Sequence, residues 1–116
     1  MKMTFTGQPQ STNHLYKMTC RNGYANVYMT KEGKAQKEVY QWEAKAQWRR
    51  PVFTEELSVK ISFYFKDKRR RDIDNYNKIL LDALTGIVYS DDKQIIKLVL
   101  TKQVDSKNPR IEFTIK

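Results

Sequence analysis

The sequence predicts an α+β fold, in which a mixed β-sheet packs against two helices in one small domain spanning residues 1–116. Two patterns carry this prediction. Apolar and polar residues alternate from Leu57 to Lys66, as they do in a half-buried strand, and apolar residues recur at spacings of three and four from Asp74 to Thr85, as they do in a helix. Weaker strand and helix patterns are mixed along the rest of the chain, and its length leaves room for one core.

The N-terminal part predicts two strands and a loop. Apolar and polar residues alternate between Met1 and Thr6, which favours a short strand. Residues 7–13, GQPQSTN, have the composition of a loop. A second strand is predicted over residues 24–29, because Val27 and Tyr28 favour extended backbone.

A first helix is predicted from an N-cap at Thr30 to Trp48, just before Pro51, a residue type that ends helices. Its apolar residues form one stripe, which we expect to face the core: Ala35, Val39, Trp42 and Ala46. The charged residues lie away from this stripe and predict a mostly basic solvent face: Lys34, Lys37, Glu38, Lys45 and Arg49.

A second helix is predicted over residues 74–85 and ends at Gly86, a residue type common at helix C-termini. Leu81 lies off the buried stripe of this helix, which predicts contact with another subunit. Alternation predicts strands over residues 96–101 and 111–115, joined by a turn. We therefore expect these two final strands to pair as a hairpin.

The charge balance indicates a nucleic acid partner. A net charge of +9 and a pI near 9.7 favour a polyanion, with DNA or RNA ahead of an acidic membrane. No apolar run approaches the about 20 residues of a membrane span, and the N-terminus lacks the apolar segment of a signal peptide. Cys20 and His14 are single, which excludes an internal disulfide, a cysteine zinc site and nuclease chemistry that needs two histidines. We expect a reducing, cytoplasmic setting.

The acidic residues are unevenly distributed. Five of the 13 follow directly on the basic run Lys68, Arg69, Arg70 and Arg71, and these five are Asp72, Asp74, Asp82, Asp91 and Asp92. Two carboxylates about 4 Å apart repel by about 1 kcal/mol in water and about 4 kcal/mol at an effective dielectric of about 20. If folding brings these acids together, a bound cation relieves the repulsion. A metal site beside a basic strip is what an enzyme needs to cut a phosphodiester bond.

The spacing of the acids suggests how such a site is built. Asp72 and Asp74 lie where a loop enters the predicted helix, and Lys78 lies one turn beyond Asp74 on the same side. Asp91 or Asp92 meets them if the chain doubles back after the helix. Carboxylate oxygens favour a hard cation such as Mg²⁺, which lowers the pKa of a bound water. Lys78 would stabilise the charge of the transition state, and the arginines at 69–71 would hold the flanking phosphates.

Plainer interpretations stay open for each of these residues. Asp72 and Asp74 can serve as helix caps, Asp82 can be a solvated surface acid, and the pair at 91–92 can belong to an ordinary turn. The basic run can bind DNA or RNA without any catalysis. The joint occurrence of these features in one window is what favours a catalytic site.

Two segments carry a resemblance to a known family. RRRDIDNYNKILLDALTG, followed by YSDDKQI, resembles the RusA-type Holliday junction resolvases, whose signature is D-x-D-N-x-x-K-x-x-x-D-A-L, a short gap and D-D-x-Q-[IV]. Residues 9–16, PQSTNHLY, are similar to that family's Pro-x-Ser-x-Asn-x-x-Tyr segment, and residues 30–36 resemble the start of its first helix. The resemblance thus covers nearly the whole chain.

The resemblance implies an endonuclease that makes paired, symmetric nicks in four-way DNA junctions during recombination and repair, using Mg²⁺ or Mn²⁺. By position, Asp72, Asp74 and Asp92 would bind the metal and Lys78 would be the essential lysine. Asp91 matches the other acid of the later pair. Gln8 and Gln10 around Pro9 depart from the family pattern, which affects the expected junction contacts and not the chemistry.

The resemblance also implies a homodimer, and symmetry supports it. A four-way junction is close to two-fold symmetric, and a C2 dimer places two identical sites on opposed strands. Two other functions stay open: a non-catalytic protein that binds branched DNA or structured RNA, and a nuclease with a broader preference for flaps or replication forks.

Overall fold

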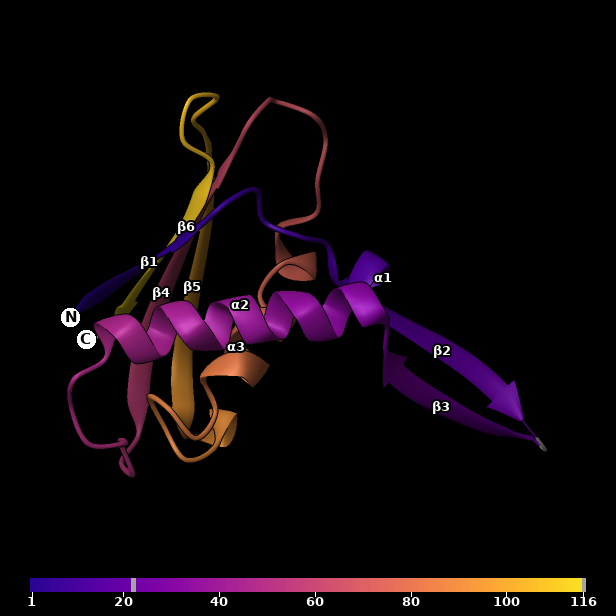
Figure 1. Cartoon of the computed structure of the whole chain (residues 1–116), viewed down its shortest axis with the longest axis horizontal. Helices are drawn as coiled ribbons and strands as arrows, with labels where there is room; N and C mark the ends of the chain where they lie inside the picture. Colours follow the sequence, from indigo (N-terminus) through magenta and orange to yellow (C-terminus); the bar gives the residue numbers. More distant parts are fainter. Residues whose placement is uncertain (22, 116) are drawn as a thin grey trace.

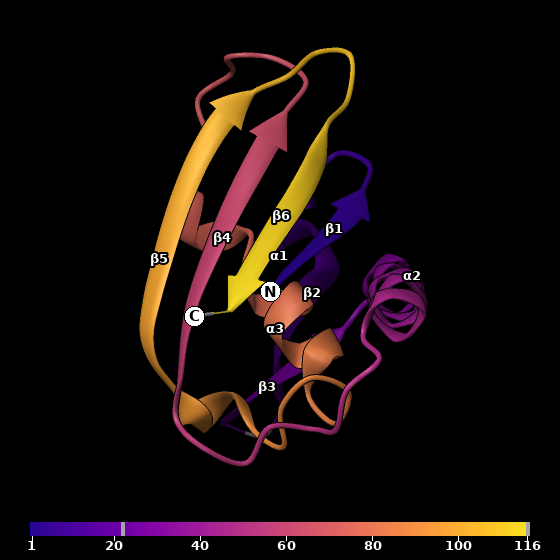
Figure 2. The same ribbon diagram turned by 90° about the vertical axis from the view of Figure 1, so that its left-hand side faces the viewer.

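The computed structural model describes residues 1–21 and 23–115. The chain forms a four-stranded sheet in the order β1-β6-β4-β5, and a separate pair of strands, β2 and β3 (Figure 1, Figure 2). The strands are β1 Lys2–Thr6, β2 Tyr16–Arg21, β3 Tyr24–Met29, β4 Leu57–Phe65, β5 Ile95–Val104 and β6 Arg110–Ile115. The helices are α1 Thr12–Leu15, α2 Lys31–Gln47 and α3 Lys78–Leu84, with short 3-10 turns η1 Ile73–Asn75 and η2 Asp92–Gln94.

The larger sheet is mixed, as predicted, because β4 pairs with β5 in parallel and with β6 in antiparallel fashion. The α+β class and the five predicted strands are confirmed, whereas β2 and α1 were not predicted. The predicted hairpin of the last two strands is wrong, because β4 lies between β5 and β6 (Figure 2). Alternation identifies a strand and its buried face, but it carries no information about which strand lies beside it.

Strand β4 is the centre of the core. Its residues Val59, Ile61 and Phe63 are almost fully buried beneath the helices, which lie on one side of the sheet (Figure 2). Phe113 of β6 and Leu80 of α3 are equally buried. Burial of one such side chain contributes about 1.5–3 kcal/mol, so this layer supplies much of the stability.

Helix α2 begins where the sequence predicts, but it buries a different face. The Thr30 hydroxyl accepts a hydrogen bond from the Gly33 N–H, at 3.1 Å, which confirms the N-cap. The buried residues are Gly33, Tyr40 and Ala44, and the ring of Tyr40 packs edge-on against Phe5. The stripe predicted to face the core is instead exposed: Ala35, Val39, Trp42 and Ala46. Helix α2 therefore carries two apolar faces, and helical spacing cannot tell which one packs on the sheet.

The second predicted helix is shorter than expected. Residues 73–75 form the turn η1, and the α-helix begins only at Lys78. Leu81 is 9% exposed and belongs to the core, so its predicted contact with another subunit is wrong. Helix α3 is enclosed on nearly all sides, and a short helix in that position buries residues off its main stripe as well.

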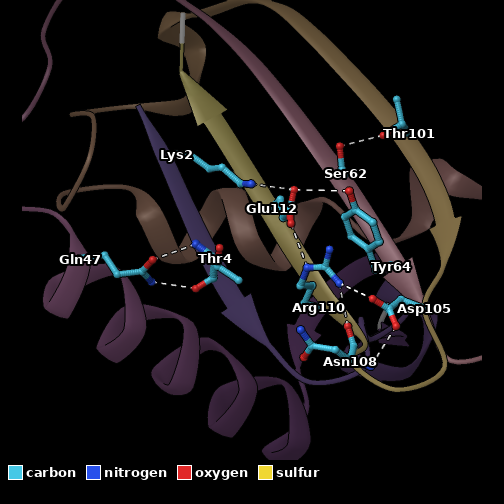
Figure 3. A network of polar contacts seen from close by, with 10 residues as sticks. All are labelled: Lys2, Thr4, Gln47, Ser62, Tyr64, Thr101, Asp105, Asn108, Arg110 and Glu112. Atoms are coloured by element: carbon cyan, nitrogen blue, oxygen red, sulfur yellow. Dashed lines mark hydrogen bonds and ion pairs between the residues drawn. The ribbon is translucent and has the colours of Figure 1, made fainter.

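The opposite face of the sheet carries a polar network (Figure 3). The Arg110 guanidinium pairs with Asp105 at 2.8 Å and with Glu112 at 2.9 Å, and it lies over the Tyr64 ring. Lys2, on β1, forms an ion pair with Glu112 at 3.1 Å. These contacts join the loop after β5 to three strands and leave this face hydrophilic. No helix among the described residues is long and apolar enough to cross a membrane.

Gly33 provides a test of how α2 packs. A Cβ at this position would collide with the Leu15 carbonyl oxygen and the Met29 side chain. Helix propensity favours Gly33→Ala by about 1 kcal/mol, but the collision should reverse the sign and lower the free energy of unfolding by about 1–3 kcal/mol. Urea denaturation measures the difference. Ala35→Gly, on the exposed face, should lose only about 1 kcal/mol from propensity. A stabilised Gly33→Ala variant would contradict this packing.

Candidate active site

The turn η1 positions the first two acids. After β4 the chain passes through the basic run and enters η1, which the Thr12 hydroxyl fixes by donating a hydrogen bond to the Asn75 carbonyl at 2.7 Å. Asp72 and Asp74 are both exposed here. In the part of the chain that the structure describes, the Asp72 side chain makes no helix-capping hydrogen bond, and neither carboxylate forms an ion pair. Both groups are thus available to a ligand.

Lys78 lies in a small cluster with Asp82 and Tyr16. The Lys78 ammonium lies 3.8 Å from the Asp82 carboxylate and 5.0 Å from the centre of the Tyr16 ring. The Tyr16 hydroxyl donates a hydrogen bond to the same carboxylate, at 2.7 Å. Burial and the negative charge of Asp82 raise the pKa of the Tyr16 phenol far above its ordinary value, so it stays a donor. Asp82 is therefore a partly buried anchor for Lys78, and not a free surface acid.

Asp91 caps the turn η2 and Asp92 is the first residue of that turn, and the two carboxylates have different surroundings. The Asp91 carboxylate accepts a hydrogen bond from the Lys93 N–H, at 3.0 Å, and the Gln94 side chain accepts one from the Asp91 N–H. This capping box lowers the pKa of Asp91. Partial loss of hydration raises the pKa of Asp92, and the charges of Asp91 and Asp82 raise it further, against an opposing effect of Lys78. Asp92 is thus a carboxylate under like-charge repulsion.

The structure brings together only part of the predicted site. Asp92, Asp82 and Lys78 act on one another electrostatically. Within residues 1–21 and 23–115, however, no group of three or more His, Cys, Asp or Glu side chains is placed so that it could hold a metal ion. A shared ion at Asp72, Asp74 and Asp92 stays a prediction. The donor set itself fits a hard cation, because all its atoms are carboxylate oxygens and the two on η1 are exposed and free of ion pairs.

The topology explains why the acids are spread out. Strand β5 is parallel to β4, and its first residue, Ile95, pairs with Leu57 at the start of β4. The basic run follows Phe65, at the other end of β4. The crossover between the two strands contains η1 and α3 and runs back along the sheet. Asp72 is thus next to the basic run, whereas Asp92 is near the opposite end of the sheet.

The basic run lines a groove. A hollow of about 210 Å³ lies between the loop after β4 and the end of β5, and its lining includes Lys68, Arg69, Arg70, Arg71 and Lys102. Lys68, Arg69 and Arg70 are exposed, as phosphate-binding residues should be. Lys102 is an addition from β5, because the predicted strand ended at residue 101 and the observed one continues to Val104.

Arg71 differs from its neighbours. Its guanidinium pairs with the Asp67 carboxylate at 2.8 Å, donates to the carbonyls of Asp67 and Arg69, and lies over the Phe65 ring. The side chain is only 10% exposed. The structure therefore gives Arg71 a part in shaping the loop, which orients the other three cations.

Sequence reasoning missed the roles of Tyr16 and Asp82. Asp82 had the plain interpretation of a surface acid, and Tyr16 entered only as part of the segment at residues 9–16. The spacing of Lys78 and Asp82, four residues apart on a helix, was the signal for their ion pair. No local signal exists for Tyr16, because it reaches Asp82 from another part of the chain.

A basic groove followed by exposed carboxylates is typical of nucleic-acid-binding domains that carry an acidic site. Comparison with known proteins identifies the family. A model of the endodeoxyribonuclease RusA family matches residues 6–116. The crossover junction endodeoxyribonuclease of Enterobacteria phage 82 is 29% identical over 108 residues, which cover 92% of this chain and 87% of the phage protein. The chain belongs to the RusA endodeoxyribonuclease family.

Two further relatives match shorter stretches. The crossover junction endodeoxyribonuclease RusA of Escherichia coli K12 is 37% identical over 60 residues, which are 51% of this chain and 50% of that protein. An uncharacterized protein of Bacillus subtilis, YqaN, is 42% identical over 45 residues, or 39% of this chain and 31% of YqaN. Both names are those of the relatives and not of this protein.

Arg70 and Arg71 form a matched test of the groove. Arg70→Ala should weaken binding of a DNA junction and reduce the log–log salt dependence of binding by about 0.9 for the lost phosphate contact, with unchanged stability. Arg71→Ala should instead lower the free energy of unfolding by about 1–2 kcal/mol, because it removes charge-assisted hydrogen bonds. Fluorescence anisotropy at several salt concentrations and urea denaturation separate the two effects. The reverse pattern would contradict the assignment of Arg71 to the loop.

Asp91 and Asp92 should respond to substitution with opposite signs. Folding raises the pKa of the Asp92 carboxyl group, so its ionisation costs more in the folded protein than in the unfolded chain. The free energy of unfolding therefore falls as the pH rises through the folded-state pKa. Asp92→Asn should therefore unfold at a higher urea concentration than the wild type at pH about 7, and this gain should vanish below the ordinary carboxyl pKa of about 3.9. Asp91→Ala should be less stable at neutral pH, because it loses the cap. The measurement is urea denaturation in metal-free buffer, and equal gains at both pH values would contradict the repulsion at Asp92.

Proposed function

We propose that this protein is a metal-dependent endonuclease that acts as a homodimer and resolves four-way DNA junctions by paired, symmetric nicks, in DNA recombination and repair in the cytoplasm. The observation that carries the proposal is the position of exposed Asp72 and Asp74 directly after a basic groove, in a chain of the RusA family. The names of the phage and Escherichia coli relatives, both crossover junction endodeoxyribonucleases, support the choice of substrate.

Asp72, Asp74 and Asp92 would hold Mg²⁺, with Mn²⁺ able to substitute, and Asp91 is a further candidate ligand. A bound divalent ion supplies an activated water and offsets charge on the scissile phosphate. Loss of hydration and the nearby charges of Asp91 and Asp82 raise the pKa of Asp92. A cation at this position would relieve the repulsion between these charges.

The other residues bind and orient. Lys68, Arg69 and Arg70 would hold the phosphates of one DNA arm, in the groove that Lys102 completes. Lys78 would place its ammonium against the phosphate that gains charge in the transition state. Asp82 and Tyr16 keep this ammonium in position, because the carboxylate accepts from the Tyr16 hydroxyl and pairs with Lys78.

One observation favours a second function. Among the described residues, no three acids are gathered into a group that could hold a metal ion, which favours binding without cleavage. A protein that binds branched DNA or structured RNA in this way would use the same basic groove. A preference for flaps or replication forks is a further variant of the nuclease, which a panel of branched substrates separates from junction resolution.

Cleavage of a labelled four-way junction, with and without Mg²⁺, tests the proposal. The wild type with metal should give paired nicks in opposite strands. Asp72→Asn and Lys78→Ala should bind the junction within about twofold of the wild type but lose cleavage by a factor of about 100 or more, because their effects belong to the chemical step. Glu38→Gln, at an exposed residue of α2 that does not line the basic groove, is the control and should cut normally. If all forms bind and none cuts, the protein is a junction-binding protein.

A further inference from the structure

The β2–β3 hairpin is an arm whose described residues are mostly exposed. It extends beyond the N-terminal end of α2, away from the main sheet (Figure 1). A two-stranded sheet by itself is only marginally stable in water. The described residues between 17 and 28 are exposed wherever the structure defines their burial. The arm therefore needs a partner surface.

The pairing register sorts the arm into two different faces. Paired residues share a face, and successive residues alternate. Met18 pairs with Val27 and Cys20 with Ala25, so these four form one uncharged face. Met18 and Val27 are 72% and 64% exposed. The register gives the opposite face Lys17 with Tyr28, and Asn26 and Tyr24 further along.

The charge distribution indicates what covers the uncharged face. A chain of net charge +9 repels its own copies, so contact between two copies is favoured where cations are absent. A surface that binds DNA has the opposite character, because it is polar and positively charged. The face of Met18, Cys20, Ala25 and Val27 carries no charge and fits a second copy better than a polyanion.

We propose that the two copies of the dimer pack this face of the hairpin against itself, across the two-fold axis. The inference rests on the homodimer of the proposed function and assigns its contact surface. An isologous C2 contact uses the same patch on both copies, and two apolar faces of equal length are self-complementary. Tyr16, at the base of the arm, contacts the Lys78 cluster, so the contact would place the two active sites on either side of the axis.

A second exposed apolar surface is the rival site. Ala35, Val39 and Trp42 of α2 line a groove of about 620 Å³, and Trp42 is 80% exposed. Glu38 and Glu43 also line this groove. It differs from the hairpin in having charged walls, so the hairpin is the stronger candidate.

Adjacent residues on opposite faces supply the first test. Val27→Lys and Asn26→Lys add the same charge to the same strand, but only the first places it between the copies. By sedimentation without DNA or metal, Val27→Lys should weaken the dimer by more than about a hundredfold, and Asn26→Lys should leave it intact. A wild type that is monomeric, or a Val27→Lys dimer as tight as the wild type, would overturn the proposal. So would a Val27→Lys dimer that has lost only its junction affinity, because the face would then contact DNA.

Cys20 supplies the second test, which needs no disruptive variant. It lies exposed on the proposed contact face, so a short bis-maleimide should join two wild-type copies through it. Cys20→Ser with Asn26→Cys moves the thiol to the opposite face and should not cross-link. Cross-linking of Cys20→Ser with Val39→Cys instead would place the contact at the α2 groove and refute the hairpin. A dimer that cross-links as expected but fails to nick junctions would refute the proposed function and leave the interface standing.

Discussion

The burial of β4 between a parallel and an antiparallel neighbour is the constraint on which the rest of the structure depends. Parallel pairing with β5 requires the chain to return along the sheet before β5 can start, and this return contains η1 and α3. The acids lie along that return. Lys78 and Asp82 are therefore carried by a helix whose other residues fill the core, which fixes the backbone at both positions.

Asp82 links the packing of the domain to the residues of the proposed site. Its carboxylate accepts a hydrogen bond from Tyr16 of β2 and pairs with Lys78 of α3. Its charge also raises the pKa of Asp92 on η2. Removal of its charge would free the Lys78 ammonium and lower the repulsion on Asp92 at the same time. In the proposed function, such a residue would position Lys78 without touching substrate.

The sequence predicted the local features well and the long-range ones poorly. The strand at β4 and the cap at Thr30 follow from side-chain alternation and hydroxyl chemistry within a few residues. The buried face of α2, the partner of β5 and the burial of Leu81 depend on how elements pack, which periodicity does not encode. For the site, spacing predicted the acids and Lys78, and their roles stay a prediction. The Tyr16 contact joins residues far apart in the chain and left no pattern.

The separation between the basic groove and η2 also sets a length. Strand β4 has nine residues, and the two features lie beyond its opposite ends. At about 3.3 Å per residue this is about 30 Å, which is the length of about nine base pairs of duplex DNA. A phosphate held in the groove would thus lie nearly one full helical turn of straight duplex from Asp92. Because Asp72 directly follows the groove, an ion shared by Asp72, Asp74 and Asp92 would have to draw η1 and η2 together.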